Sequence, residues 1–178
     1  MGEYEHLHHT FEPVFDGKSR ILILGTFPSV KSRENEFYYG HPQNRFWKVL
    51  VAVTGADTPV GTEEKIRFLK DSRISIWDVI DSCDIIGSSD SSIRNVVPAD
   101  LSVILEKADI RQIYANGGKA WQLYQKYLLP AAGRSCIKLP STSPANAAFS
   151  LERLKEEWSV IKEHLEENDM PGSIRIQP

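Results

Sequence analysis

The sequence predicts an α/β fold, a three-layer α/β/α sandwich around a mainly parallel, four-stranded central sheet. Four short apolar runs, rich in β-branched residues, are spread along the 178 residues. None alternates cleanly with polar residues, which is typical of strands buried on both faces of a parallel sheet. Segments with helical periodicity separate the runs, and such strand–helix alternation builds a parallel sheet through right-handed crossovers.

The four expected strands are RILILG, ISIWDVI, IRQIYA and CIKLP, at residues 20–25, 74–80, 110–115 and 136–140. Between them, a first helix is expected over residues 44–53, after Pro42. Thr62 is expected to cap the second helix and Asp100 the third, because a hydroxyl or carboxylate accepts from the free N–H groups of a first turn.

Two further helices complete the order. GGKAWQLYQKYL, residues 117–128, follows the third strand directly, and Ser150 opens the last helix. In that last helix, apolar residues recur at three- and four-residue steps, which indicates a packing stripe rather than a site. The stripe consists of Leu151, Leu154, Trp158, Ile161 and Leu165.

The composition is that of an ordinary globular protein, with 41% hydrophobic and 25% charged residues. We expect a single domain over residues 1–178. The longest apolar runs, ILIL and VLVAV, are far shorter than a membrane span. The first ten residues are too polar and acidic for a signal peptide, so a cytoplasmic protein is expected.

Metal and redox chemistry have few candidate ligands. Cys83 and Cys136 are the only cysteines and form no CxxC pair, which excludes a zinc ribbon and a cysteine-ligated iron–sulfur cluster. Two buried thiols are expected instead. His6, His8 and His9 lie in an apparent flexible tail without a matching carboxylate. No metal or cofactor is therefore expected.

Positive charge is concentrated in one segment. Residues 17–50 hold six basic and two acidic side chains, although the formal net charge of the chain is −3. A basic segment on an acidic body indicates a local anionic partner, unless it is simply an uneven, solvated surface.

The candidate ligand site lies beyond the carboxyl ends of the strands, where open α/β sheets bind their ligands. The four segments there are GTFPS, DSCDIIGSSDSS, NGGKA and PSTSPANA, at residues 25–29, 81–92, 116–120 and 140–147. All are rich in Gly, Ser, Pro or Asn, residues that suit close approach of a ligand to the backbone. Dinucleotide, P-loop and hydrolase-elbow motifs are absent.

Aromatic residues near the first two loops favour stacking on a planar ring. Phe27 offers a flat face, with Tyr38 and Tyr39 nearby in sequence. Phe46 and Trp47 start a helix and fit the core equally well. Asp78, Asp81 and Asp84 follow a strand and could include an acid or base, although at least one should cap a turn.

The segment HPQNRFW, residues 41–47, holds the main candidate for catalysis. Asn44 is either a helix N-cap or a neutral amide that orients a water molecule through its donor and acceptor. Arg45 could grip a phosphate by a bidentate contact. PSTSPANA is either a plain connection or a rigid loop that enters a DNA groove beside an extruded base.

Taken in order, ILILGTFPS, YYGHPQNRFW, SIWDVIDSCDIIGSSDSSI, IYANGGKA and LPSTSPANA resemble the uracil-DNA glycosylase superfamily, over residues 6–165. The branch most similar is that of the hypoxanthine-DNA (deoxyinosine) glycosylases, related to the G/T(U) mismatch enzymes. The resemblance implies a monofunctional DNA glycosylase of base excision repair without a cofactor. Its partner would be double-stranded DNA with a damaged or mismatched base. A monomer at the nucleoid is expected.

The resemblance also implies roles for single residues. Asn44 would be the main catalytic side chain, with Ser141 assisting at the leaving base. The base would be bound by Gly25, Thr26, Phe27, Tyr38, Tyr39 and Asn116. The DNA strand would be contacted by Pro28, Ser29, Lys31, Arg45, Ser143, Pro144, Ala145 and Asn146.

Two departures from the family pattern concern the substrate. Uracil-specific enzymes carry Asp in the first loop and mismatch enzymes carry Asn, whereas this region here contains Phe27; Ser141 stands where many relatives have His. Both changes favour hypoxanthine as the excised base. Alternatives are uracil or a G/T(U) mismatch, a hydrolase of free nucleosides or nucleotides, and a non-catalytic nucleic-acid-binding module.

Overall fold

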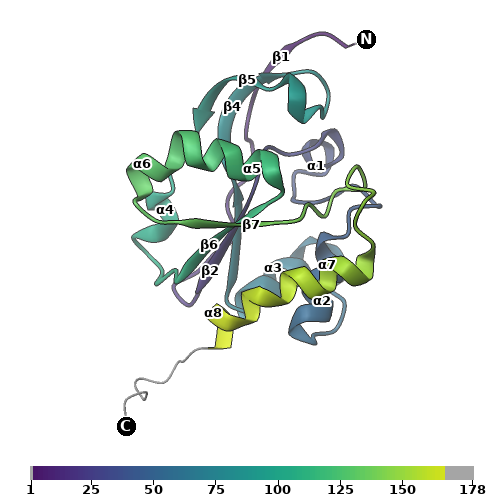
Figure 1. Cartoon of the computed structure of the whole chain (residues 1–178), viewed down its shortest axis with the longest axis vertical. Helices are drawn as coiled ribbons and strands as arrows, with labels where there is room; N and C mark the ends of the chain where they lie inside the picture. The colour runs from purple at the N-terminus through teal and green to yellow at the C-terminus, as the bar shows by residue number, and fades with distance from the viewer. Residues whose placement is uncertain (1, 167–178) are drawn as a thin grey trace.

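The structure is a computed structural model and describes residues 2–166. Its central element is a four-stranded parallel sheet in the order β3-β2-β6-β7. The strands are β2 (Ile21–Gly25), β3 (Ile74–Asp78), β6 (Gln112–Asn116) and β7 (Cys136–Leu139). Helices cover both faces of this sheet (Figure 1), so the predicted three-layer α/β/α fold is confirmed.

The helices of the described chain are mostly short. They are α1 (Val30–Asn35), α2 (Phe46–Thr54), α3 (Gly61–Asp71), α4 (Ser102–Leu105), α5 (Gly118–Leu123), α6 (Leu129–Ala132), α7 (Leu151–Trp158) and α8 (Lys162–Glu166). A π-helical turn, Tyr124–Leu128, joins α5 to α6, and a 3₁₀ turn, Ser159–Ile161, joins α7 to α8. Helices α2, α3 and α7 cover one face of the sheet, and α4 and α5 the other (Figure 1).

The alternation of side chains along β2 divides the core between the two faces. Ile21 and Ile23 pack with α2, α3 and α7, whereas Leu22 and Leu24 pack with α4 and α5. All four are fully buried. A strand with period-2 side chains and a helix layer on each side needs apolar residues at every position, which explains the unbroken run ILIL.

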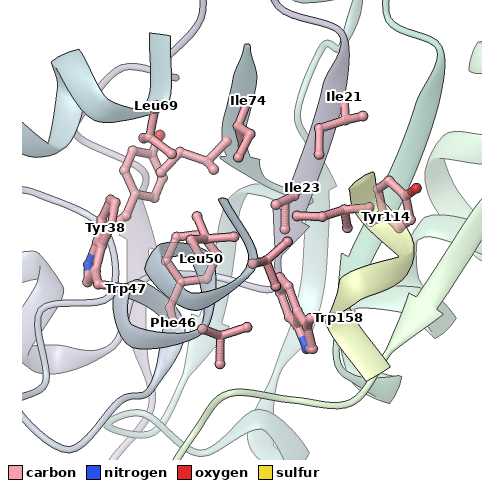
Figure 2. Packing of buried hydrophobic residues seen from close by; sticks show 14 of the residues in the cluster. Ile21, Ile23, Tyr38, Phe46, Trp47, Leu50, Leu69, Ile74, Tyr114 and Trp158 are labelled. Carbon is pink, nitrogen blue, oxygen red and sulfur yellow. The ribbon is translucent and has the colours of Figure 1, made fainter. Parts of the chain in front are cut away.

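The core cluster between the sheet and helices α2, α3 and α7 is built around large aromatic residues (Figure 2). Phe46 and Trp158 meet edge to face at 6.0 Å, and neither is exposed. Trp158 also donates from its indole N–H to the Pro140 carbonyl, 2.9 Å away, which fixes the end of β7 against α7. The stripe expected along the last helix is confirmed, because Leu154, Trp158 and Ile161 are all fully buried.

A second sheet was not expected from the sequence. Strands β1 (Glu5–His8), β4 (Ile80–Ile85) and β5 (Arg94–Pro98) form an antiparallel sheet in the order β1-β4-β5. The predicted flexible tail and the predicted loop 81–92 are therefore wrong in part. Ser and Asp favour loops, but pairing with a strand on each side overrides that preference in β4.

The N-terminal caps of two helices and the two cysteines can also be compared with the expectations from the sequence. Thr62 does not cap α3, whose N-cap is Val60. Ser150 caps α7 as expected, by accepting from the Arg153 N–H. Both cysteines are buried and free, as expected. Within residues 2–166, no helix is long and apolar enough to cross a lipid bilayer.

Candidate active site

A cavity of about 460 Å³ lies at the carboxyl ends of the parallel strands, within the range of small-molecule sites, about 300–1,000 Å³. It is lined by Gly25, Thr26, Phe27, Pro28, Ser29, Ser32, Tyr38, Tyr39, His41, Asn44, Asp78, Ser88, Ser89, Asp90, Asn116, Ser141, Thr142, Ser143, Pro144 and Ala145. The lining therefore includes thirteen of the sixteen residues singled out from the sequence, all but Lys31, Arg45 and Asn146. It contains two carboxylates and neither Lys nor Arg among the described residues.

Parallel pairing brings the polar ends of neighbouring strands together. Gly25 at the end of β2 is in register with Asp78 at the end of β3. Asn116 ends the next strand, β6, in register with Leu139 of β7. Each polar residue follows a buried apolar run, so the chain must carry it to the same edge of the sheet.

A directional chain of hydrogen bonds holds Asn44. Its Oδ1 accepts from the Phe46 backbone N–H at 2.9 Å and from the Thr142 hydroxyl at 2.8 Å. The Thr142 hydroxyl in turn accepts from Asn116 Nδ2 at 3.0 Å, and Asn116 Oδ1 accepts from the Thr142 backbone N–H at 3.0 Å. Because backbone N–H groups only donate, both amides have one possible orientation.

These hydrogen bonds limit which atoms of Asn44 can contact a ligand. Both lone pairs of Oδ1 are occupied, while Nδ2 has no hydrogen bond to any described residue. Asn44 can therefore donate to a water through Nδ2 but cannot also accept from it through Oδ1. The expectation that the amide holds a water through both groups is wrong for the acceptor. The side chain presents one N–H₂ donor to the cavity, and the contact with the Phe46 N–H fixes its position. Asn44 is not the N-cap of α2, because that position is Arg45.

Thr142 also belongs to this hydrogen-bond network, although the sequence pattern did not indicate it as a site residue. It is fully buried and joins the ends of two loops, since it contacts both Asn44 and Asn116. The sequence pattern indicates its neighbours Ser141 and Ser143 instead. No local signal separates the three, because a hydroxyl is identified as buried only once the loop conformation is known.

Gly117 explains why Ser141 stands beside Asn116. The glycine has φ +100°, and a Cβ built on it would lie 3.1 Å from the Cβ of Ser141. Only glycine tolerates this backbone conformation readily and leaves room for the close approach. Ser141 lines the cavity, where its Oγ accepts from the Ser143 N–H at 3.1 Å.

Arg45 does not face the cavity and is not free to grip a phosphate, so that expectation is wrong. Its guanidinium donates to the carbonyls of Ser143, Asn146 and Phe149, and Nε donates to that of Thr142. Arg45 thus binds the loop of residues 140–149 from within the protein. Arginine suits this task because its five N–H groups spread over several acceptors.

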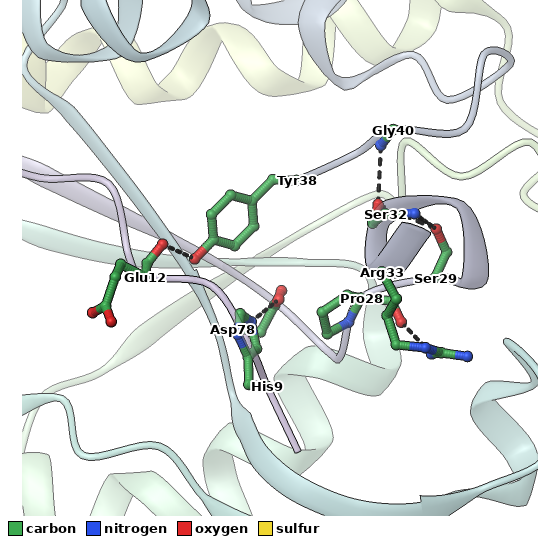
Figure 3. Close-up of polar contacts among 9 residues, drawn as sticks. All are labelled: His9, Glu12, Pro28, Ser29, Ser32, Arg33, Tyr38, Gly40 and Asp78. Carbon is green, nitrogen blue, oxygen red and sulfur yellow. Dashed lines mark hydrogen bonds and ion pairs between the residues drawn. The ribbon is translucent and has the colours of Figure 1, made fainter. Parts of the chain in front are cut away.

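Of the other residues expected to contact DNA, some line the cavity and others contact groups of the protein itself. Ser29 lines the cavity and also caps α1, where it accepts from the Ser32 N–H (Figure 3). Lys31 is exposed outside the cavity, 3.6 Å from Glu34. Asn146 donates to the Ser141 carbonyl at 3.0 Å and lies outside the lining. Arg33 donates to the carbonyls of Pro28 and Gly87, so with Arg20 and Arg45 three of the six basic side chains of residues 17–50 are bound to backbone carbonyls.

The aromatic candidates lie on different walls. Phe27 is partly exposed and lines the cavity. Tyr39 stacks on Phe46 with ring centroids 3.9 Å apart, so one of its faces is already covered. Tyr38 is 2% exposed, and its hydroxyl donates to the Glu12 carbonyl at 2.7 Å (Figure 3). Phe46 and Trp47 belong to the core.

A buried His–Asp pair lies at the same edge of the sheet. His9 Nε2 lies 2.8 Å from Asp78 Oδ2, with the two side chains 4% and 6% exposed (Figure 3). The sequence left the role of Asp78 open and treated His9 only as a weak metal candidate. Among the described residues, no three His, Cys, Asp or Glu side chains gather in a metal-binding arrangement.

Comparison with known proteins gives consistent results. The family model described as "Uracil DNA glycosylase superfamily" matches residues 12–164. A hypoxanthine DNA glycosylase of Methanosarcina acetivorans is 37% identical over 156 residues, covering 86% of this chain and 97% of that protein. One of Methanosarcina barkeri is 32% identical over 151 residues, covering 84% and 94%.

A solved structure is similar as well. The solution NMR structure of a protein from Methanosarcina acetivorans, described as a candidate uracil DNA glycosylase, superposes with a TM-score of 0.75. The two sequences are 38% identical, and the match covers 88% of this chain and 96% of that one.

Proposed function

Because the chain belongs to the uracil-DNA glycosylase superfamily, we propose that it excises a deaminated base, hypoxanthine, from double-stranded DNA. The N-glycosidic bond is hydrolysed and an abasic site remains. The observation that carries this proposal is the locked Asn44 amide, whose free N–H₂ lines a cavity large enough for one base. No cofactor takes part, and a monomer acts on DNA of the nucleoid in the cytoplasm.

The reaction needs an extruded nucleotide in a defined position. Extrusion costs a few kcal/mol and costs least for a weakly paired base, so a mispaired hypoxanthine is selected already at this step. The base then enters the cavity beside Phe27, whose ring stacks on it. Ser143, Pro144 and Ala145 stand at the same cavity and fill the space between the strand and the pocket.

Cleavage develops positive charge on the sugar and negative charge on the departing base. Asn44 Nδ2 then donates to the attacking water, holding its oxygen near the sugar, because Oδ1 is already occupied. The Ser141 hydroxyl donates to the departing base. Since both donors are set before the substrate arrives, their reorganisation costs little in the transition state.

The activity is tested with duplexes that carry hypoxanthine, uracil, xanthine or a G·T mismatch, followed by gel detection of abasic sites. We expect cleavage with hypoxanthine as the preferred base. Free deoxyinosine serves as a second substrate, because release of base from it at a comparable rate would support a nucleoside hydrolase. Absence of base release from every duplex would contradict the proposal.

Asn44→Ala tests the catalytic role. The variant should lose about 100-fold or more in single-turnover rate, the usual scale for one positioned donor, while fluorescence anisotropy shows unchanged duplex affinity. Gln122→Ala removes an exposed amide on α5, outside the cavity, and should leave both quantities unchanged. Near-wild-type cleavage by Asn44→Ala would show that another group performs its role.

A further inference from the structure

We propose that Asp78 and Tyr39 read the extruded base, and that together they recognise its lactam edge, the adjacent ring N–H and C=O. This inference rests on the proposed function and deepens it, because a lactam edge is the product of deamination. Hypoxanthine, xanthine and uracil carry it, whereas adenine and cytosine present an acceptor nitrogen beside an amino group.

The two polar groups converge on one point beside Gly25. A Cβ built on this glycine would lie 2.5 Å from Asp78 Oδ1 and 2.9 Å from the Tyr39 hydroxyl. All three residues line the cavity. The missing side chain of Gly25 therefore leaves a small polar niche, and the carboxylate and hydroxyl lie close enough together to contact neighbouring atoms of one ring.

Asp78 supplies the acceptor of the pair. Its Oδ2 is held by His9 Nε2, whereas Oδ1 has no hydrogen bond to any described residue. Because a carboxylate only accepts, the proton of that contact belongs to His9 Nε2. His9 is thus a positioning residue that turns the remaining oxygen of Asp78 towards the cavity.

Tyr39 supplies the donor. Its hydroxyl is buried and meets the geometric criteria of a hydrogen bond with no group within residues 2–166. Burial, and then the nearby charge of Asp78, raise the pKa of Tyr39 above its ordinary value. The Asn116 side chain lies near enough to donate to the hydroxyl oxygen and so lowers this pKa in part, which leaves the phenol's own proton free. The phenol therefore keeps its proton at neutral pH and can donate to a carbonyl oxygen. An unpaired buried donor costs free energy, so a ligand that supplies the acceptor gains affinity.

The arrangement discriminates adenine from hypoxanthine and cytosine from uracil, whereas guanine and thymine carry the same lactam edge and are not excluded by it. The ring N–H of hypoxanthine donates to Asp78, and its carbonyl oxygen accepts from Tyr39. Adenine would turn the lone pair of its ring nitrogen towards the carboxylate, which leaves a buried charge facing an acceptor. A hydroxyl can rotate to accept from an amino group, so most of the discrimination comes from Asp78.

Binding measures this recognition apart from chemistry. In an Asn44→Ala background, we compare affinities for duplexes with hypoxanthine or adenine opposite thymine. The background protein should prefer hypoxanthine. Adding Asp78→Ala should reduce that preference by about 10-fold or more, and adding Tyr39→Phe should reduce it by a smaller factor, since the phenyl ring keeps its stacking on Phe46.

Asp84→Ala is the matched control. It breaks the other His–Asp pair, His6–Asp84 at 2.7 Å, which joins β1 to β4 outside the cavity. The preference should survive this change. His9→Gln, whose amide can still donate to Asp78, should retain the preference, whereas His9→Ala should reduce it.

The outcomes separate the two proposals. If the otherwise native protein excises hypoxanthine but Asp78→Ala and Tyr39→Phe leave the preference unchanged, the inference is wrong and the proposed function stands. An equal affinity of the background protein for both duplexes overturns the inference in the same way. If the native protein releases no base at all, the proposed function fails, and the inference fails with it.

Discussion

At the scale of single residues, the roles depend on which atoms remain free after folding. Asn44 and Arg45 are neighbours, and both are polar groups that could contact DNA. The fold occupies the acceptor of Asn44 and leaves its donor open. It directs the guanidinium of Arg45 to backbone carbonyls of the loop 140–149. Residue type predicted Asn44 at the cavity, but it could not predict where Arg45 points.

Arg45→Ala should therefore act on the loop and not on phosphate binding. We expect a loss of about 2 kcal/mol in the free energy of unfolding, because several part-buried carbonyls lose a charged donor. Arg45→Lys should not restore it, since one ammonium group cannot reach carbonyls spread over the loop. Denaturant unfolding measures both variants.

The salt dependence of duplex binding distinguishes this role from a phosphate contact. Loss of one phosphate contact lowers the slope of log K against log salt by about 0.9. Arg45→Ala should keep the wild-type slope even where its affinity is reduced. A slope that falls by about one unit would show that Arg45 reaches the DNA after all.

At the scale of elements, the four parallel strands were predictable and the antiparallel sheet was not. Runs such as ILIL have one explanation, burial on both faces. The segment IDSCDI of β4 mixes buried and exposed residues without clean alternation, and its Ser and Asp residues are typical of loops. Its strand conformation depends on β1 and β5, which are distant partners that local sequence does not specify.

Deletion of residues 2–8 tests the importance of β1 for the cavity. The parallel sheet should remain folded, because β1 adds only one partly buried side chain, Leu7, to its described core clusters. Base excision should fall, because His9 follows the strand directly and its backbone N–H donates to the Asp81 carbonyl at 2.7 Å. Circular dichroism measures the folding of the truncated protein, and single-turnover assays measure its excision of the base. Unchanged excision would show that the active site does not depend on β1.

At the scale of the whole molecule, buried acidic groups set the alkaline limit of stability. Burial raises the pKa of Cys83 from 9.0 to about 11, that of Cys136 from 9.0 to about 12, and that of Tyr124 from 10.0 to about 12. In each case the folded protein retains a proton that the unfolded chain loses at lower pH. The contribution of these three groups to stability should therefore be constant below about pH 9 and decline as the pH rises towards 12.

Thermal unfolding between pH 8 and 10.5 measures this decline. The double variant Cys83→Ala, Cys136→Ala should show a weaker dependence between pH 9 and 10, because two of the contributing groups are gone. At pH 8, neither thiol of the folded wild-type protein should react with a disulfide reagent, whereas both should react in denaturant. Fast reaction under native conditions would contradict the burial of these thiols.

The described residues of the cavity wall include Asp78 and Asp90 but neither Lys nor Arg, which has a consequence for competing ligands in a cell. Soluble mononucleotides greatly outnumber lesions, and each brings a phosphate that this wall repels. A base delivered on a polymer keeps its phosphates outside the cavity and escapes that repulsion. The metabolite pool should thus leave the enzyme unoccupied, and millimolar inosine monophosphate should barely slow it.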